Sequence, residues 1–289
     1  MQQQRKKFEV SLPPPVVFDG LEPTINIAHR GGAGVYPENT LLSFAAAVSK
    51  FNCPVIETDV HILADGEVVL FHDSSLERTT NGYGPISAHR WDTVSLLDAG
   101  YHFAGGVDGP APFRDQGLRI PRLVDALRAF PTTRFNIELK SANPLLVRAV
   151  ADILRNENAL ERVCIGSEFD GVAERLFDAL PEATHFFPRA ALGSWVMGAL
   201  NGRPQLPSKA YRVLDMPAHF HGVQLVTEEL ISYAHQFGYW VNVWTIDEPS
   251  EMRRLIDLGV DGIMTDRPDR LASVLNERER QPSRTSVRK

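Results

Sequence analysis

The chain has few cysteines, no long apolar run and no block of basic residues, and each absence excludes a class of protein. Cys53 and Cys164 are the only cysteines among its 289 residues. Two thiols make neither a disulfide framework nor a thiolate metal cluster, so we expect buried structural side chains. Nowhere do about 18 uncharged apolar residues run together, which is the length that a transmembrane helix needs.

The charge balance and the N-terminal segment narrow the class further. A formal net charge of -6 argues against a nucleic-acid partner, because no face-sized basic block offsets it. Residues 1–20 hold basic side chains but no apolar stretch of signal-peptide length, so we expect a cytoplasmic protein. Hydrophobic residues at 43% and charged residues at 23% are typical of a globular protein with a full-sized core.

The segment 55–73, VIETDVHILADGEVVLFHD, is predicted to form a hairpin. Two apolar runs flank the Asp-Gly pair at 65–66, which is the dipeptide most favoured for a two-residue turn. Counting outward from that turn places Asp59 opposite His72, and strand alternation points Glu57 to the same side. Two carboxylates and one imidazole from a single element suit a metal site with an acid–base partner. The alternative is a hairpin whose polar face is simply solvated.

Short apolar strands alternate with amphipathic helices along most of the chain. The strands are expected near residues 25, 56, 136, 164, 185, 212, 241 and 262. Eight βα units in roughly 250 residues predict an α/β fold, the (β/α)₈ or TIM barrel. An open doubly wound sheet is the alternative, but the turn HRGGAGVYP lacks the GxGxxG pattern of dinucleotide-binding sheets.

This pattern divides the chain into a barrel and its additions. Residues 1–22, which are polar and rich in proline, are expected to form an arm lying on the surface. Residues 23–275 form the barrel, and an insertion at about 74–120 follows the hairpin of the second strand as a small cap. Residues 276–289 are expected to be a solvated polar tail.

Polar side chains stand where the expected strands end, and in a barrel of this kind those ends share one mouth. They are His29 and Arg30 after the first strand, Glu57 and Asp59 on the second, His72 on its hairpin partner, Glu138 and Lys140 on the third, Trp244 and Thr245 on the seventh, and Thr265 and Asp266 on the eighth. Polar ends on otherwise apolar strands are costly unless they have a function. The mouth is therefore the predicted active site.

The residue types at this mouth predict a phosphate-binding metal site. Three carboxylates close together repel one another strongly unless a cation lies among them. Glu57, Asp59 and Glu138 offer only oxygen ligands, which suit one divalent cation, Mg²⁺ or Ca²⁺, rather than zinc. Arg30 and Lys140 beside that ion would attract a phosphate. The two imidazoles on opposite walls would then serve as general acid and base.

The sequence resembles the glycerophosphodiester phosphodiesterase family over nearly all of residues 25–272. The motifs that carry the resemblance are HRGGAGVYPENT at 29–40, ETD at 57–59, FHD at 71–73, LERTTNGYG at 76–84, LLDAG at 96–100, IP at 120–121, IELK at 137–140, VWTID at 243–247 and GVDGIMTDRPD at 259–269. Together these motifs are highly specific, whereas HRG or HD alone would be weak.

This resemblance implies a barrel enzyme with an inserted cap that uses a divalent ion to hydrolyse glycerophosphodiesters to glycerol 3-phosphate and an alcohol. The roles that it implies are an acid–base pair (His29, His72), three metal ligands (Glu57, Asp59, Glu138) and three phosphate or substrate contacts (Arg30, Lys140, Trp244). We prefer His29 as base and His72 as acid. The attacking group is either water or the adjacent glycerol hydroxyl, which would give a cyclic phosphate first.

Three positions near these motifs call for separate expectations. Asp247 stands where family members usually carry Asn, so we expect a supporting contact near Trp244 to differ from the one in those members. Glu168 is an extra acid, and we expect its side chain to face solvent, as exposed Glu usually does. His61 continues the face of Asp59 but lies farther along the hairpin, so we expect a supporting or surface role rather than a metal ligand.

An apolar stripe in the helix expected over residues 192–200 leaves a second function open. Trp195, Val196, Met197 and Leu200 would suit a lip for a lipid or a membrane surface, although such a stripe is more often core. With that lip, the chain would be a lysophospholipase D or a phospholipase C-like phosphodiesterase in peripheral contact with a membrane. A non-catalytic binder of a phosphate ligand is harder to reconcile with two histidines and three acids at one mouth.

Overall fold

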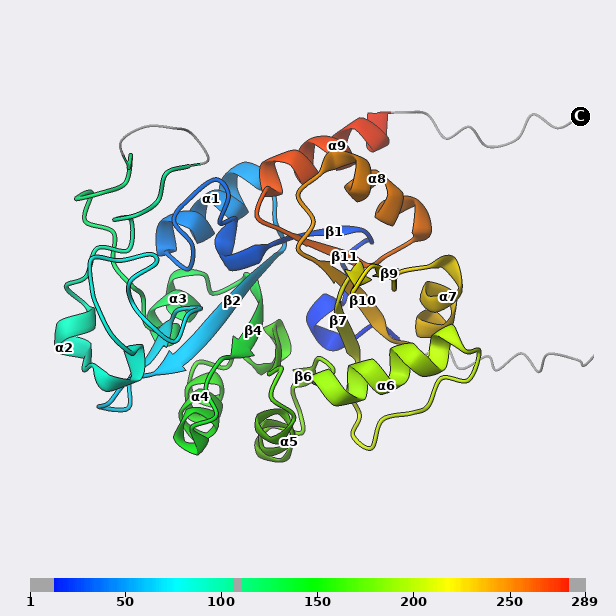
Figure 1. Cartoon of the computed structure of the whole chain (residues 1–289), viewed down its shortest axis with the longest axis horizontal. Coiled ribbons are helices and arrows are strands. Elements are labelled where there is room, and N and C mark those ends of the chain that lie inside the picture. Colours follow the sequence, from blue (N-terminus) through cyan, green and yellow to red (C-terminus); the bar gives the residue numbers. More distant parts are fainter. Residues whose placement is uncertain (1–12, 106–110, 281–289) are drawn as a thin grey trace, which may run out of the picture.

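The computed structural model describes residues 13–105 and 111–280, which form a nearly closed barrel of parallel strands surrounded by helices (Figure 1). The strands of the barrel are β1 (Ile25–Ala28), β2 (Val55–Ile62), β4 (Arg134–Leu139), β5 (Val163–Gly166), β6 (Thr184–His185), β7 (Val213–Pro217), β10 (Trp240–Trp244) and β11 (Gly262–Thr265). Around the barrel they lie in the order β6, β5, β4, β2, β1, β11, β10, β7. A bridge between Phe186 and Val213 brings the two ends of this order together. The predicted TIM barrel is confirmed, and the open doubly wound sheet is wrong.

Helices between the strands cover the outside of the barrel. They are α1 (Leu41–Phe51), α3 (Leu123–Ala129), α4 (Pro144–Asn156), α5 (Asp170–Ala179), α6 (Arg189–Leu200), α7 (Glu228–Gln236), α8 (Pro249–Leu258) and α9 (Pro268–Arg280). Local signals set several of their starts. The Thr40 hydroxyl accepts the Ser43 N–H at 3.1 Å, and the Asn143 side chain accepts the Leu145 N–H at 3.0 Å. Their apolar faces pack against the strands in two large clusters.

The hairpin formed by β2 and β3 (Val68–Leu70) differs from the expected two-residue turn. Backbone hydrogen bonds place residues 64–66 in a three-residue loop, whose last member is a glycine with φ of 91°. A glycine in this left-handed conformation is typical of three-residue hairpin loops. The register therefore differs by one residue from the expected one. Asp59 lies opposite Phe71, whose N–H donates to the Asp59 carbonyl at 2.9 Å, and the expected pairing of Asp59 with His72 is wrong.

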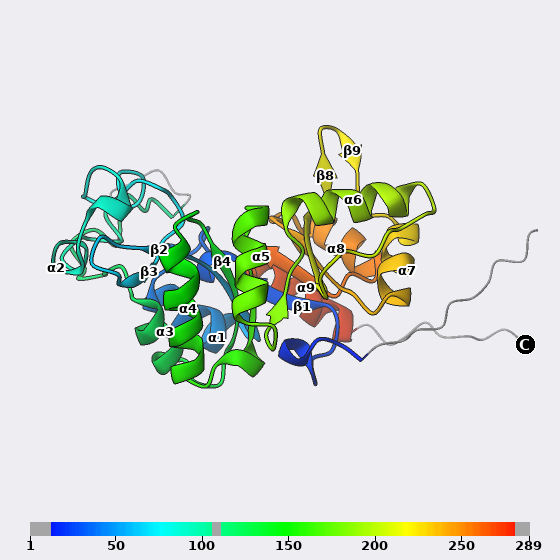
Figure 2. The ribbon, with the colours of Figure 1, turned by 90° about the horizontal axis from the view of Figure 1, so that it is seen from below.

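The N-terminal segment expected on the surface lies partly beneath the barrel (Figure 2). Val17 and Phe18, in a short 3₁₀ turn at 16–18, are fully buried among side chains from the lower ends of the strands. The ring of Phe18 stacks on Trp240 with 4.5 Å between ring centroids. The expectation that this whole segment lies on the surface is therefore wrong. Leaving the apolar floor of the barrel open to water would be costly, and Val17 and Phe18 cover it. Residues 1–12 lie outside the described part of the chain.

The insertion between β3 and α3 has a small core of its own. It contains a 3₁₀ turn at 86–88 and the short helix α2 (Trp91–Val94). Leu76, Ile86 and Ile120 pack there against apolar side chains of the hairpin. The insertion thus stands beside the hairpin at one end of the elongated molecule (Figure 1). Its bounds, and those of the arm and tail, stay predictions.

Other expectations concern the C-terminus and the thiols. Helix α9 continues to Arg280, so the first residues of the expected polar tail are helical and exposed. Both Cys53 and Cys164 are buried and unpaired, as expected. Within residues 13–105 and 111–280, no helix combines the length and the apolar character that crossing a membrane requires.

Candidate active site

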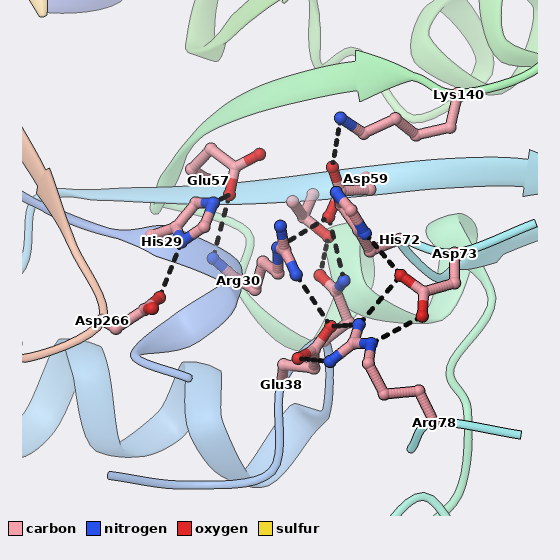
Figure 3. Close-up of polar contacts among 12 residues, drawn as sticks. His29, Arg30, Glu38, Glu57, Asp59, His72, Asp73, Arg78, Lys140 and Asp266 are labelled. Carbon is pink, nitrogen blue, oxygen red and sulfur yellow. Dashed lines mark hydrogen bonds and ion pairs between the residues drawn. The ribbon is translucent and has the colours of Figure 1, made fainter. Parts of the chain in front are cut away.

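His29 follows β1 directly, in a tight turn over residues 29–31, and faces the mouth of the barrel. Its Nδ1 lies 2.6 Å from Asp266 Oδ1, as Figure 3 shows. Because that carboxylate takes the Nδ1 proton as a hydrogen bond, the neutral imidazole has Nε2 free, 3.8 Å from Glu57 Oε2. Burial lowers the pKa of His29, but Glu57 and Asp266 outweigh burial and raise it. The ring is thus oriented to accept a proton at Nε2.

The turn that carries His29 needs a glycine. Gly31 has φ of 82°, and a Cβ at this position would lie 2.3 Å from Ser43 Oγ at the start of α1. A side chain would therefore push the turn away from the helix. This contact explains locally why the glycines of the HRGG motif follow the histidine.

His72 stands across the mouth and is oriented by a second carboxylate. Its Nδ1 lies 2.6 Å from Asp73 Oδ1. Arg78, in the insertion, donates to Asp73 at 2.5 Å and to both oxygens of Glu38 at 2.7 Å. Burial raises the pKa of Asp73, but Arg78 and His72 outweigh burial and lower it to about 2. The aspartate is therefore charged, and it leaves Nε2 of His72 available for proton transfer.

Three carboxylates meet between the two histidines. Glu57 and Asp59 share one face of β2, and Asp59 pairs in register with Glu138 on the neighbouring strand β4. One oxygen from each of the three lies within 4.8 Å of the others. Glu57 and Asp59 are almost completely buried. The acids predicted from the strand ends are thus brought together.

The crowding of these acids shifts their pKa values in opposite directions. Burial, and then the charge of Asp59, raise the pKa of Glu57 well above its usual range. Burial also opposes ionisation of Asp59, but Lys140 and Arg30 outweigh burial and lower its pKa. The pKa of Glu138 is raised by burial and by Asp59. One acid of the cluster therefore tends to hold a proton unless further positive charge enters.

The two predicted phosphate contacts are bound to these acids. Lys140 Nζ lies 2.6 Å from Glu138 and 3.4 Å from Asp59. The backbone N–H of Arg30 donates to Glu57 at 2.9 Å, and its guanidinium donates to Glu38 at 3.1 Å. Both cations line the same cavity as the acids, so either can reach an anion there.

The donor set fits a divalent cation of the hard type. The three carboxylates supply only oxygen atoms, converge from two adjacent strands, and carry more negative charge than the buried site tolerates. Glu57, Asp59 and Glu138 are the residues that would hold such an ion. The choice between Mg²⁺ and Ca²⁺ stays a prediction.

A cavity of about 820 Å³ contains all of the predicted site residues. Those residues are His29, Arg30, Glu57, Asp59, His72, Glu138, Lys140 and Trp244. Trp244, at the end of β10, is 42% exposed and borders the cavity. Its place suits a contact with a bound substrate, and the role of each residue stays a prediction.

The side chains singled out as departures have defined contacts. Asp247 Oδ1 accepts the Asp266 N–H at 2.9 Å, so it supports the partner of His29 rather than Trp244. Glu168 is bound to Arg189 at the rim of the cavity, so its side chain does not simply face solvent. A histidine ring nitrogen of the buried His61 lies 3.1 Å from the His72 carbonyl, which is the supporting role expected.

Several residues of the site were not assigned a role from the sequence. Asn39 donates to Asp59 at 3.1 Å and accepts from Thr58 at 2.7 Å. Glu38 and Arg78 belong to the PENT and LERTT motifs, and the motifs were the only signal for them. Asp73 follows His72 in the chain, but nothing in the local pattern shows that a residue binds its neighbour's ring.

The comparisons with known proteins agree with this geometry. The model of the glycerophosphoryl diester phosphodiesterase family matches residues 29–270. This chain belongs to that family. Among its relatives, a probable glycerophosphodiester phosphodiesterase 2 of Mycobacterium tuberculosis is 33% identical over 260 residues, which cover 87% of this chain and 90% of the relative.

Other members of the family are more distant. Lysophospholipase D GDPD1 of Rattus norvegicus is 26% identical over 280 residues, covering 87% of this chain and 86% of its own. A phosphodiesterase of Oleispira antarctica, solved in complex with the product sn-glycerol-3-phosphate, is 26% identical with a TM-score of 0.70. That likeness covers 87% of this chain and 96% of the solved chain.

Proposed function

We propose that this protein hydrolyses glycerophosphodiesters to glycerol 3-phosphate and an alcohol, with one divalent cation, Mg²⁺ or Ca²⁺. The observation that carries the proposal is the arrangement in the cavity. Two imidazoles, each oriented by its own carboxylate, flank three converging acids and two cations. The product named in the Oleispira antarctica structure, sn-glycerol-3-phosphate, supports the same reaction.

Each group has a task that follows from its contacts. A divalent cation bound by Glu57, Asp59 and Glu138 would polarise the phosphate and neutralise the charge of the acids. Arg30 and Lys140 bind the phosphate oxygens, where negative charge grows as the transition state forms. These two cations already lie among the acids, so they need only shift toward the phosphate.

The two histidines move the protons. His29 accepts a proton at Nε2 from the attacking oxygen, because Asp266 holds Nδ1 and stabilises the charged ring. His72 donates a proton to the departing alcohol, and Asp73 keeps its ring in position. The attacking oxygen belongs to water or to the adjacent glycerol hydroxyl, and the second route passes through a cyclic glycerol phosphate.

Phosphorus NMR of glycerophosphocholine with the purified protein tests this proposal. We expect release of glycerol 3-phosphate with Mg²⁺ or Ca²⁺ and loss of turnover after treatment with EDTA. His29→Ala and His72→Ala should each reduce kcat/KM by at least about 10²-fold. His89→Ala is the matched control, because this histidine belongs to the insertion and its ring nitrogen lies 2.9 Å from the Tyr83 carbonyl, outside the cavity.

The same experiment separates catalysis from mere binding. A non-catalytic phosphate binder would bind glycerol 3-phosphate tightly and release none from the diester. Full activity of either histidine variant would refute the acid–base roles, and unchanged turnover in EDTA would refute the ion. A cyclic phosphate signal that appears before glycerol 3-phosphate would select the route through the glycerol hydroxyl.

A further inference from the structure

The cavity has two walls of different chemistry. The acids, the cations and the histidines come from the ends of β1, β2 and β4 and from the hairpin. The opposite wall comes from β7, α6 and the small hairpin of β8 (His219–Phe220) and β9 (Val223–Gln224). Its side chains are mostly apolar, and they include Phe187, Leu192, Val196, Met197, Phe220 and Leu225. In the proposed mechanism, the groups that act on the reacting phosphate all belong to the first wall.

The apolar wall continues outside the cavity. Of the twelve large exposed hydrophobic side chains among the described residues, Met197, Phe220 and Trp244 line the cavity, and Leu200 and Val223 lie on the same helix α6 and the same small hairpin. Phe220 and Val223 face each other across the β8–β9 hairpin and are 58% and 55% exposed. Figure 2 shows this hairpin standing clear of the barrel above α6.

The stripe expected on α6 therefore has two functions. Trp195 and Val196 are buried in the core beneath the helix, as an ordinary amphipathic helix requires. Met197 and Leu200 are 59% and 39% exposed, and core packing does not explain their position. Exposed apolar side chains that line one continuous surface mark a binding site more often than scattered ones do.

The kind of side chain indicates what binds there. A quaternary ammonium group, such as that of choline, would need several aromatic rings around it. The cavity lining does include four aromatic side chains, Phe186, Phe187, Phe220 and Trp244. Beside them stand the aliphatic side chains of Leu192, Val196, Met197 and Leu225. Aliphatic side chains suit an alkyl chain, and the open rim lets that chain extend outward over the hairpin.

One position on this wall is kept small. Gly193, on α6, borders the cavity, and a Cβ there would meet no atom within 4 Å. Glycine within a helix costs about 1 kcal/mol relative to alanine, and here neither close packing nor a left-handed backbone requires it. Its effect is to leave the cavity wider beside α6, where it forms an open apolar groove.

We propose that this apolar wall is a subsite for the alkyl chain of a glycerophosphodiester that carries one acyl group on its glycerol. The inference rests on the proposed function and names its substrate class. In the net reaction by either route, the oxygen of water ends bonded to phosphorus, and the bond from phosphorus to the oxygen of the head alcohol is broken. The proton taken from water ends on that alcohol. The acyl ester is untouched, so the products are a monoacylglycerol phosphate and the free alcohol.

The expected effect of the chain follows from its burial. A fully buried methylene would raise affinity about fourfold, and a groove that is open on one side gives about half of that free energy, or about twofold per methylene. Lengthening the acyl group from hexanoyl to decanoyl adds four methylenes. We therefore expect kcat/KM to rise by about 16-fold across that series.

The test compares glycerophosphocholine with hexanoyl- and decanoyl-lysophosphatidylcholine, each below its aggregation concentration. Gly193→Leu should bring the ratio of decanoyl to hexanoyl kcat/KM to about one, because the new side chain fills the groove. Met197→Asp, at an exposed position, should flatten the ratio in the same way. Gly171→Leu is the matched control: this glycine lies on α5 outside the cavity, and a Cβ there has space.

A binding measurement separates this inference from the proposed function. Calorimetry compares glycerol 3-phosphate with its hexanoyl and decanoyl esters, and we expect the longer chain to bind more tightly. If no diester is cleaved but the gradient in affinity is present, the proposed function fails and the subsite stands. A flat series in both assays, a gradient that survives Gly193→Leu, or a rise that appears only with vesicles would overturn the subsite.

Discussion

A buried acid at the floor of the cavity provides a quantitative test of the electrostatics. Asp215, on β7, accepts hydrogen bonds from the amide nitrogens of Asn136 and Asn242 at 2.7 and 2.8 Å. Burial raises the pKa of Asp215 from 3.8 to about 6, although these two hydrogen bonds oppose the shift. The folded protein then keeps this proton to a higher pH than the unfolded chain does. The free energy of unfolding therefore falls as the pH rises through this interval.

The size of the effect follows from the shift. The change from 3.8 to about 6 is about 2 pH units, and about 1.4 kcal/mol per unit gives a penalty of about 3 kcal/mol at pH 8. Asp215 partly faces the cavity, so this is an upper value. At pH 4 less than about 1 kcal/mol remains, because this pH lies at the lower end of the interval between the two pKa values. Asp215→Asn removes the titration, so its stability relative to the wild type should rise by about 2 kcal/mol from pH 4 to pH 8.

Urea unfolding at pH 4, 6 and 8 measures this difference. The prediction concerns only how the difference in free energy of unfolding between Asp215→Asn and the wild type changes with pH. An effect of the new amide on Asn136 or Asn242 that does not depend on pH therefore cancels. Asp152→Asn, at an exposed position of α4, is the control and should show no such change. A difference between Asp215→Asn and the wild type that is the same at all three pH values would refute the reasoning.

Two further predictions concern residues outside the predicted site. Arg78→Gln removes the link between Asp73 and Glu38, so kcat should fall about tenfold, whereas Arg90→Gln in the same insertion should not change it. Arg78 lowers the pKa of Asp73, so the loss of Arg78 should also move the acid limb of the pH profile of kcat to higher pH. An acid limb at the same pH in both proteins would contradict this. Phe18→Ala should lower the free energy of unfolding by about 3–5 kcal/mol in urea, since its ring is fully buried. Val16→Ala, at a 62% exposed neighbour, should cost under about 0.5 kcal/mol, and equal losses would mean that the floor does not depend on this ring.

The strands of the barrel were predictable because each is set by a short local pattern. Every expected strand appears in the structure. The convergence of Glu57, Asp59 and Glu138 also follows from strand alternation and the shared mouth of a barrel. A periodicity of two residues decides which face a side chain takes, and that information is local.

The hairpin shows where such local reasoning fails. The Asp-Gly pair is compatible with a two-residue turn and with a three-residue loop, and counting from it gave a register wrong by one residue. His72 reaches the site nevertheless, because the chain has left β3 before it and its position depends on the insertion and Arg78. A register is decided by the pairing of the whole strand, which a dipeptide does not contain.

By itself, the order of residues determined the strands, their inward faces and the set of acids, imidazoles and cations at the mouth, because these depend on neighbours a few positions apart. Only the tertiary structure decided which carboxylate orients each histidine, that Phe18 closes the barrel floor, and that α6 and the β8–β9 hairpin build an apolar wall. Asp266 and His29 are 237 positions apart, and their contact exists only because β1 and β11 are adjacent in a closed ring.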